Sequence, residues 1–189
     1  VGPLPPASVA ADRQLREQRG DVDRAIHEVI ENHVRYAGAQ GLVTNVGGLV
    51  TAPVTIPANV TGLAMVQTRM IAGIAHLRGY DLTDPRVRNA VLTCILGEDR
   101  VDELVAALRL PAPPMAMATA PAHDPTLDPI VSAEVASDLI SRVAGKRLAI
   151  SAARRVPLVG GLVGMGADGF AAWKVGRYAD RELLPRRRA

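Results

Sequence analysis

A run of 33 residues without a charged side chain, residues 36–68, constrains the fold more than any other feature of this chain. A transmembrane helix needs about 18 or more consecutive apolar residues. Pro53, Pro57, Asn45, Asn59 and several glycines interrupt the apolar run here. We therefore expect two glycine-loosened helices that meet at residues 52–57 and pack deep inside a helical bundle, and not a membrane span.

Apolar residues recur at helical spacing along most of the chain, without a useful length of strand-like alternation. The pattern predicts helices over residues 21–40, 57–79, 85–97, 99–108, 129–155 and 167–184. Proline and aspartate stand at several of the predicted starts, and Gly79 is suited to a left-handed C-terminal cap. The predicted class is all-α, a single compact bundle of about six to seven helices around the Gly/Pro-interrupted apolar central pair.

Three segments lie outside this helical pattern. Residues 1–20 join a proline-rich start to a polar stretch that is poor in apolar residues, so we expect a flexible N-terminal arm. Residues 110–129 contain six prolines and are predicted to form a linker within the helical domain of residues 21–184. Residues 185–189 form a basic tail.

Composition narrows the classes of partner. Aromatic residues make up 3% of the chain, too few for a platform that stacks bases, and without a recognition motif we expect no specific nucleic-acid partner. The single cysteine, Cys94, excludes an internal disulfide framework, and a cytoplasmic location is the default. Residues 141–189 carry 11 Lys and Arg against three acidic residues, a balance of +8. This basic end favours an anionic membrane surface as a partner.

Two motif-like patterns do not carry chemistry. Gly164, Gly166 and Gly169 match G-x-G-x-x-G, but a dinucleotide site needs a preceding strand and a second strand that brings an acidic residue about 20 positions further on, and we expect neither around these glycines, which are followed by a basic stretch. Glycines in this segment suit close helix packing.

His27 and His33 are six residues apart, about 240° around a helix, so they cannot share a metal ion. We predict neither a metal nor a cofactor.

Arg69 is the first charge after the uncharged segment, and His76 follows two helical turns along the same face. In one interpretation Arg69 satisfies helix-end carbonyls or pairs with an aspartate, namely Asp81, Asp84 or Asp168. In the other it anchors a phosphate or carboxylate head group at the mouth of an apolar cavity, since a guanidinium binds such groups bidentately. The candidate ligand-binding residues are then Leu63, Gln67, Arg69, Met70, Ile74 and His76.

The last predicted helix has two faces. Its expected core stripe is Ala172, Val175, Ala179 and Leu183. The other face combines aromatic and basic side chains, which a membrane interface favours. Alternatively, Trp173 packs under the linker and the arginines are simply solvated. The candidate membrane-surface residues are Phe170, Trp173, Lys174, Arg177 and Arg181.

Two blocks of sequence carry a family resemblance. The first, residues 49–84, includes Ile56-Pro57-Ala58-Asn59, the segment Met-Val-Gln-Thr-Arg-Met-Ile at 65–71, and Gly79-Tyr80-Asp81; the second, residues 146–178, includes Arg-Val-Pro-Leu-Val-Gly at 155–160 and Gly176-Arg177. Together they resemble the EcsC protein family of bacteria. The resemblance implies that residues 21–184 form an EcsC-like helical domain. It also implies membrane association, and the family is named for a locus that encodes an ABC transporter.

These observations predict a non-catalytic protein that binds lipid or another hydrophobic molecule and associates peripherally with the cytoplasmic face of the membrane. One rival is a protein-interaction module for a membrane transporter, in which the apolar segment is only core. Another is a hydrolase acting on lipid, with Cys94 or a serine as nucleophile, although the chain has no G-x-S-x-G elbow.

Overall fold

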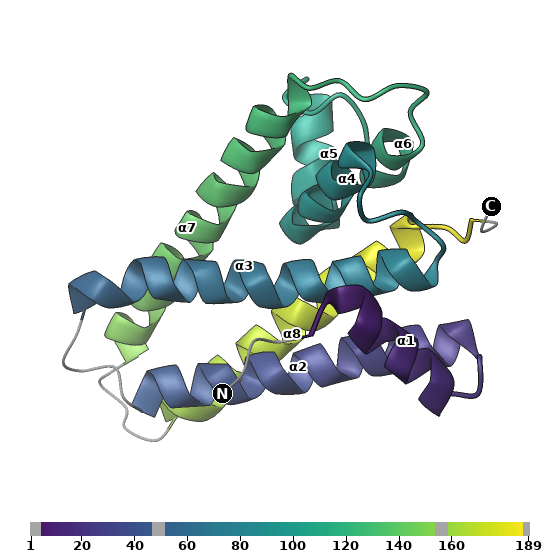
Figure 1. Cartoon of the computed structure of the whole chain (residues 1–189). Coiled ribbons are helices and arrows are strands. Elements are labelled where there is room, and N and C mark those ends of the chain that lie inside the picture. The colour runs from purple at the N-terminus through teal and green to yellow at the C-terminus, as the bar shows by residue number, and fades with distance from the viewer. Residues whose placement is uncertain (1–4, 47–51, 154–158, 187–189) are drawn as a thin grey trace.

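The computed structural model describes residues 5–46, 52–153 and 159–186, with side chains over 5–38, 61–145 and 169–186. These residues form eight α-helices and no strand, which confirms the all-α class (Figure 1). The helices are α1 (Ala7–Glu17), α2 (Val22–Val46), α3 (Ala52–Leu77), α4 (Pro85–Leu96), α5 (Glu98–Ala106), α6 (Pro114–Ala118), α7 (Leu127–Ala153) and α8 (Val159–Glu182).

The helices α2 and α8 form the most extensive pair of the bundle, and they run antiparallel. Gly169 lies against Val34, and Gly176 lies against Ile30 and Met70. A Cβ atom at position 176 would stand 3.0 Å from Ile30 Cγ1 and 3.2 Å from Met70 Sδ. The missing side chain of Gly176 therefore lets α8 approach α2 and α3 closely.

A continuous core joins α2, α3, α4 and α8. Its largest fully buried side chains include Ile26, Ile30, Met70, Ile71, Ile74, Ile95 and Leu183. Figure 1 shows α4, α5 and α6 grouped at one end of the molecule, with α7 running diagonally away from them. The expected core stripe of α8 is confirmed, because Ala172, Val175, Ala179 and Leu183 are all buried.

The helix α7 is tied to α4 and α5 by charged side chains. Glu134 of α7 is nearly buried and forms ion pairs with Arg100 and Arg109. About two turns beyond Glu134, Arg142 pairs with Asp138 at 2.6 Å and donates to the carbonyl of Leu96 at 2.6 Å. The last contact satisfies a carbonyl that the end of α4 leaves without a helical partner.

The boundaries of α4 agree with the sequence pattern. The side chain of Asp84 accepts a hydrogen bond from the backbone N–H of Arg86 at 2.8 Å, and Pro85 occupies the first position of the helix. Gly79, after α3, has a φ of 88°, the left-handed conformation expected of a C-terminal cap. The next helix, α5, begins at Glu98, directly after Gly97 and one residue before the predicted start at residue 99.

Other helix boundaries differ from the predicted ones. The helix α3 begins at Ala52 and not at Pro57, since Pro53 lies in the first turn, where a missing N–H costs nothing. The helix α8 begins at Val159, although the glycine-rich residues 158–169 were expected to form a turn. Packing against a neighbouring helix offsets the low helix propensity of glycine, about 1 kcal/mol per residue relative to alanine.

The predicted flexible arm is wrong over residues 7–17, which form α1. Ala11 is buried at 1% exposure, and Leu15 packs against the core. His76 Nε2 lies 2.8 Å from Asp12 Oδ1, which ties α1 to α3. The physical reason for the error is that α1 docks through small alanines, which leave only a weak apolar signal among polar residues.

The predicted linker of residues 110–129 is also partly wrong. It contains α6, whose Pro114, Met117 and Ala118 are buried, because proline suits the first helical position and methionine fills a gap in the core. Beyond α8, the backbone N–H of Arg186 donates to the carbonyl of Arg78 at 2.8 Å. Residues 187–189 of the basic tail lie outside the described residues.

Candidate functional site

A groove of about 460 Å³ lies between α1, α2 and α3. Small and apolar side chains form much of its wall, including Ala7, Ala10, Ala11, Val29 and Val66. Polar side chains also line it, namely Arg13, Gln14, Asn32, His33 and Arg69. Mostly apolar surface with a few convergent polar groups is typical of small-molecule sites.

Gly73 of α3 lies beside both α1 and α2 in the wall of this groove. A Cβ atom at position 73 would stand 3.5 Å from Val29 Cγ1 and 3.7 Å from Ala11 Cβ. The alanines of α1 lie opposite α2 and α3 and reach only a short distance into the space between the helices. The groove therefore follows from small residues at a junction of three helices.

Arg69 lines the groove without an ion pair or a side-chain hydrogen bond to any described residue. Two of its proposed aspartate partners are engaged elsewhere. Asp81 accepts from the backbone and the hydroxyl of Thr83, and Asp84 pairs with Arg86 at 2.6 Å. The side chain of the third, Asp168, lies outside the described residues. Within the described structure, the guanidinium of Arg69 thus has no carboxylate to neutralise it.

His33 of α2 lines the same groove as Arg69. Its Nδ1 atom lies 2.7 Å from the carbonyl oxygen of Val29. Burial lowers the pKa of His33 below its usual value, and the charge of Arg69 lowers it further, against the opposing effect of the hydrogen bond to Val29. Sequence reasoning considered His33 only as a metal ligand and missed this position, because the contact with α3 is not visible from the α2 sequence.

The other predicted ligand-binding residues do not line the groove. Met70 and Ile74 are fully buried in the core, and Leu63 packs against it. Gln67 is 1% exposed, and its Oε1 atom accepts no hydrogen bond from the described residues. His76 pairs with Asp12 of α1. Of the six predicted residues, all within the described ranges, only Arg69 therefore reaches this groove.

The second predicted set lies on α8, near its contact with α5. The rings of Phe170 and Trp173 stack with centroids 5.9 Å apart. They remain exposed, at 61% and 42% respectively, so Trp173 does not pack under the linker as the alternative required. This exposed pair is the aromatic face of α8.

The basic side chains beside the aromatic face are ion-paired. Lys174 pairs with Asp99 at 3.2 Å, and Arg181 pairs with Glu98 at 2.5 Å. Arg177 pairs with Asp180 of its own helix at 3.2 Å. Two acidic residues of the first turn of α5 thus neutralise two of the three predicted membrane-surface cations, an arrangement that sequence spacing could not reveal.

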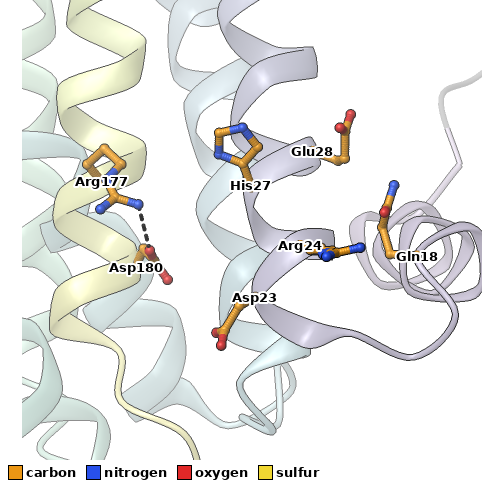
Figure 2. A pocket seen from close by; sticks show the side chains of 7 residues that line it. All are labelled: Gln18, Asp23, Arg24, His27, Glu28, Arg177 and Asp180. Carbon is orange, nitrogen blue, oxygen red and sulfur yellow. Dashed lines mark hydrogen bonds and ion pairs between the residues drawn. The ribbon is translucent and has the colours of Figure 1, made fainter.

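A second pocket of about 460 Å³ lies between the start of α2 and the end of α8 (Figure 2). Charged and polar residues line it: Gln18, Asp23, Arg24, His27, Glu28, Arg177 and Asp180. Arg78 joins Asp23 at 2.9 Å to Asp180 at 2.7 Å. No group of three His, Cys, Asp or Glu in the described structure could hold a metal ion. The pocket is therefore best explained as an ionic junction between helix ends.

The thiol of Cys94 is fully buried in α4. Burial raises its pKa far above the usual value, and the negative charge of Glu182 adds to this effect. Because the thiolate is the reactive form of cysteine, a thiol held protonated in the core is unsuited to nucleophilic attack. The hydrolase hypothesis therefore gains no support from Cys94.

Among the described helices, none combines the length and the apolar character that crossing a bilayer requires.

Comparison with protein families gives one match, in which the model of the EcsC protein family aligns with residues 13–110. Neither the curated proteins nor the solved structures include a match to the chain. The matched residues contain the C-terminal part of α1, all of α2 to α5, and both His33 and Arg69. By this match over more than half of its length, the chain belongs to the EcsC protein family.

Proposed function

We propose that the protein binds an anionic, single-chain lipid in the groove between α1, α2 and α3, without catalysis and in association with the membrane surface. The observation that carries this proposal is Arg69, a partly buried guanidinium beside apolar walls, with no carboxylate partner in the described structure. A cation withdrawn from water without a partner is unfavourable, so a complementary anion would stabilise it.

The charge of the groove favours an anionic occupant. Its charged lining residues are Arg13 and Arg69, while every acidic side chain of the described structure lies outside the lining. A phosphate or carboxylate head group could accept two parallel hydrogen bonds from Arg69. The acyl chain would then lie along the alanines and valines, where each buried methylene contributes about 0.8 kcal/mol.

Membrane association is the second part of the proposal, supported by the aromatic face of α8. Exposed Trp173 carries an amphipathic ring of the type enriched at the head-group level of a bilayer, and exposed Phe170 adds an apolar ring beside it. Delivery of a lipid to the groove, or its withdrawal from it, would require contact with such a surface. The protein would then act as a peripheral binder of single lipid molecules.

The test uses lysophosphatidylglycerol below its micelle concentration, with binding measured by calorimetry. Arg69→Ala should weaken binding roughly 10- to 100-fold, because it removes a charge-assisted hydrogen-bonding group worth about 1.5–3 kcal/mol. The matched control is Arg88→Ala, an exposed arginine of α4 outside the groove. Circular dichroism should show equal helicity in both variants. If the two variants bind equally well, the proposal fails.

A protein-interaction module remains the second candidate, favoured by the same exposed rings, because aromatic side chains are enriched at protein interfaces. A membrane transporter would be the partner. Phe170→Ser combined with Trp173→Ser should then abolish co-purification with a defined transporter complex, while Arg69→Ala should leave it unchanged. The lipid proposal makes the opposite prediction for lysophosphatidylglycerol, since Arg69→Ala weakens that binding and the double variant does not.

A further inference from the structure

We propose that His33 is a second head-group residue of the groove, and that an anionic head group binds together with a proton on its imidazole. This inference rests on the proposed function, which it deepens by adding a pH dependence. Its basis is the placement of His33 and Arg69, from two different helices, on one groove lining.

The hydrogen bond of His33 fixes the roles of its two ring nitrogens. The carbonyl oxygen of Val29 can only accept, so Nδ1, at 2.7 Å from it, must donate. In the neutral ring Nε2 is then an acceptor, and in the charged ring it becomes a donor. A phosphodiester offers only acceptors to the protein. From His33 it therefore gains a donor only when the ring is protonated.

The charges around His33 have a definite sign. From α1 the groove includes Arg13, which lies 3.9 Å from Glu17 in an exposed ion pair. From α3 it includes Arg69, and from α2 itself, besides His33, it includes Val29, Asn32 and Tyr36, none of which carries a charge at neutral pH. Burial and the Arg69 charge depress the pKa of His33 in the empty groove. An anion within about 4–6 Å reverses part of this effect, because opposite charge favours the imidazolium.

The direction of the pH dependence follows from linkage. Above the pKa of His33 in the complex, the ring is neutral in both states, and its protonation does not affect affinity. As pH falls between the pKa of the complex and the lower pKa of the empty groove, binding takes up a proton and becomes tighter. Each unit between the two pKa values corresponds to about a tenfold change in affinity.

The experiment compares the binding of lysophosphatidylglycerol at pH 7.5 and pH 5.0, since its phosphodiester keeps one negative charge throughout. We expect wild-type binding to be roughly three- to tenfold tighter at pH 5.0, the change produced by a rise of about half a unit to one unit in the pKa of His33. Glycerophosphoglycerol, the same head group without a chain, separates head-group binding from lipid binding. It should bind at least about tenfold more weakly, because it buries no methylenes.

His33→Gln is the decisive variant, because it removes the titrating ring and keeps a hydrogen-bonding side chain. It should bind lysophosphatidylglycerol with the same affinity at both pH values. His27→Gln is the matched control on the same helix but outside the groove, and it should retain the pH dependence.

Nuclear magnetic resonance supplies a second measurement on the wild-type protein. The Cε1–H signal of His33 should titrate at higher pH when lysophosphatidylglycerol is bound. Equal affinity at both pH values, or a pH dependence that survives His33→Gln, overturns this inference and leaves the proposed function intact. An absence of lysophosphatidylglycerol binding at both pH values overturns the proposed function and this inference together.

Discussion

At the scale of single residues, the same substitution should destabilise the protein at one glycine and not at another. Gly176 has its nearest neighbours at 3.0–3.2 Å from a Cβ atom, whereas Gly145 of α7 has nothing within 4 Å. Gly176→Val should lower the free energy of unfolding by about 1–3 kcal/mol, because it overpacks the contact with Ile30 and Met70. Gly145→Val should leave stability unchanged or slightly raised. Urea unfolding measures both, and equal effects would contradict the close approach of α8.

His33 should also make folding stability depend on pH in the absence of ligand. Burial depresses its pKa in the folded protein below the ordinary value of 6.5. Between these two values the unfolded chain binds the proton and the folded protein does not. Stability is therefore present above about pH 6.5 and is lost as pH falls toward the folded-state pKa.

The measurement is the free energy of unfolding in urea at pH 7.5 and pH 5.0. Wild type should lose more stability between these conditions than His33→Gln, which lacks the titrating ring. Parallel losses in the two proteins would show that His33 is not buried in the folded state. This experiment uses no lipid, so its outcome is independent of the proposed function.

At the scale of elements, the sequence predicted well wherever local rules decide the structure. The cap of α4 by Asp84, the positive φ of Gly79 and the core stripe of α8 depend on short-range patterns, and all three agree with the structure. The start of α8 at Val159 was missed, because the glycines that follow it have poor helix propensity and favour a turn when the sequence is considered alone.

The candidate site was less predictable, and for the same reason. Arg69 could be singled out because it interrupts an uncharged segment. His33 could not be singled out, since it lies 36 positions earlier in the chain. It reaches Arg69 only through the packing of α2 against α3, which the sequence does not show. Met70 and Ile74 lie on the helical stripe that was predicted to line the cavity, yet in the structure this stripe faces the core. Amphipathic spacing identifies a buried face but not whether the opposing surface leaves a space.

The docking of α1 gives a prediction for a whole element. A Cβ atom at position 73 would lie 3.7 Å from Ala11 Cβ, within the 3.5–4.5 Å range typical of disulfides. Ala11→Cys combined with Gly73→Cys should therefore form a cross-link on oxidation. Closing this loop should raise the free energy of unfolding by about 2–4 kcal/mol, because it restricts the unfolded chain.

Mass spectrometry after alkylation measures the cross-link, and urea unfolding measures its effect. The reduced double variant and each single variant are the controls, and buried Cys94 should stay unreacted in the folded protein. If α1 were a flexible arm, the two cysteines would couple slowly and without a gain in stability. That result would contradict the packing of Ala11 against α3.

At the scale of the whole molecule, charge is distributed unevenly but partly neutralised. Residues 141–189 carry a balance of +8. In the folded protein, however, Lys174 and Arg181 pair with Asp99 and Glu98 at the start of α5. Acidic residues near a helix N-terminus are themselves stabilised by the helix dipole. The α5 acids therefore compete with any anionic membrane for the two cations beside the aromatic face.

This competition predicts that removing acids, and not only adding bases, strengthens membrane binding. Glu98→Gln combined with Asp99→Asn should release Lys174 and Arg181 and raise sedimentation with phosphatidylglycerol-containing vesicles roughly severalfold. Added salt should reverse the gain, because exposed charges are screened beyond about 8 Å at physiological ionic strength. Asp102→Asn combined with Glu103→Gln changes the net charge equally on the same helix, without an ion pair to α8 among the described residues. If both double variants bind vesicles equally, net charge alone governs membrane binding, and the ion pairs between α5 and α8 play no part in it.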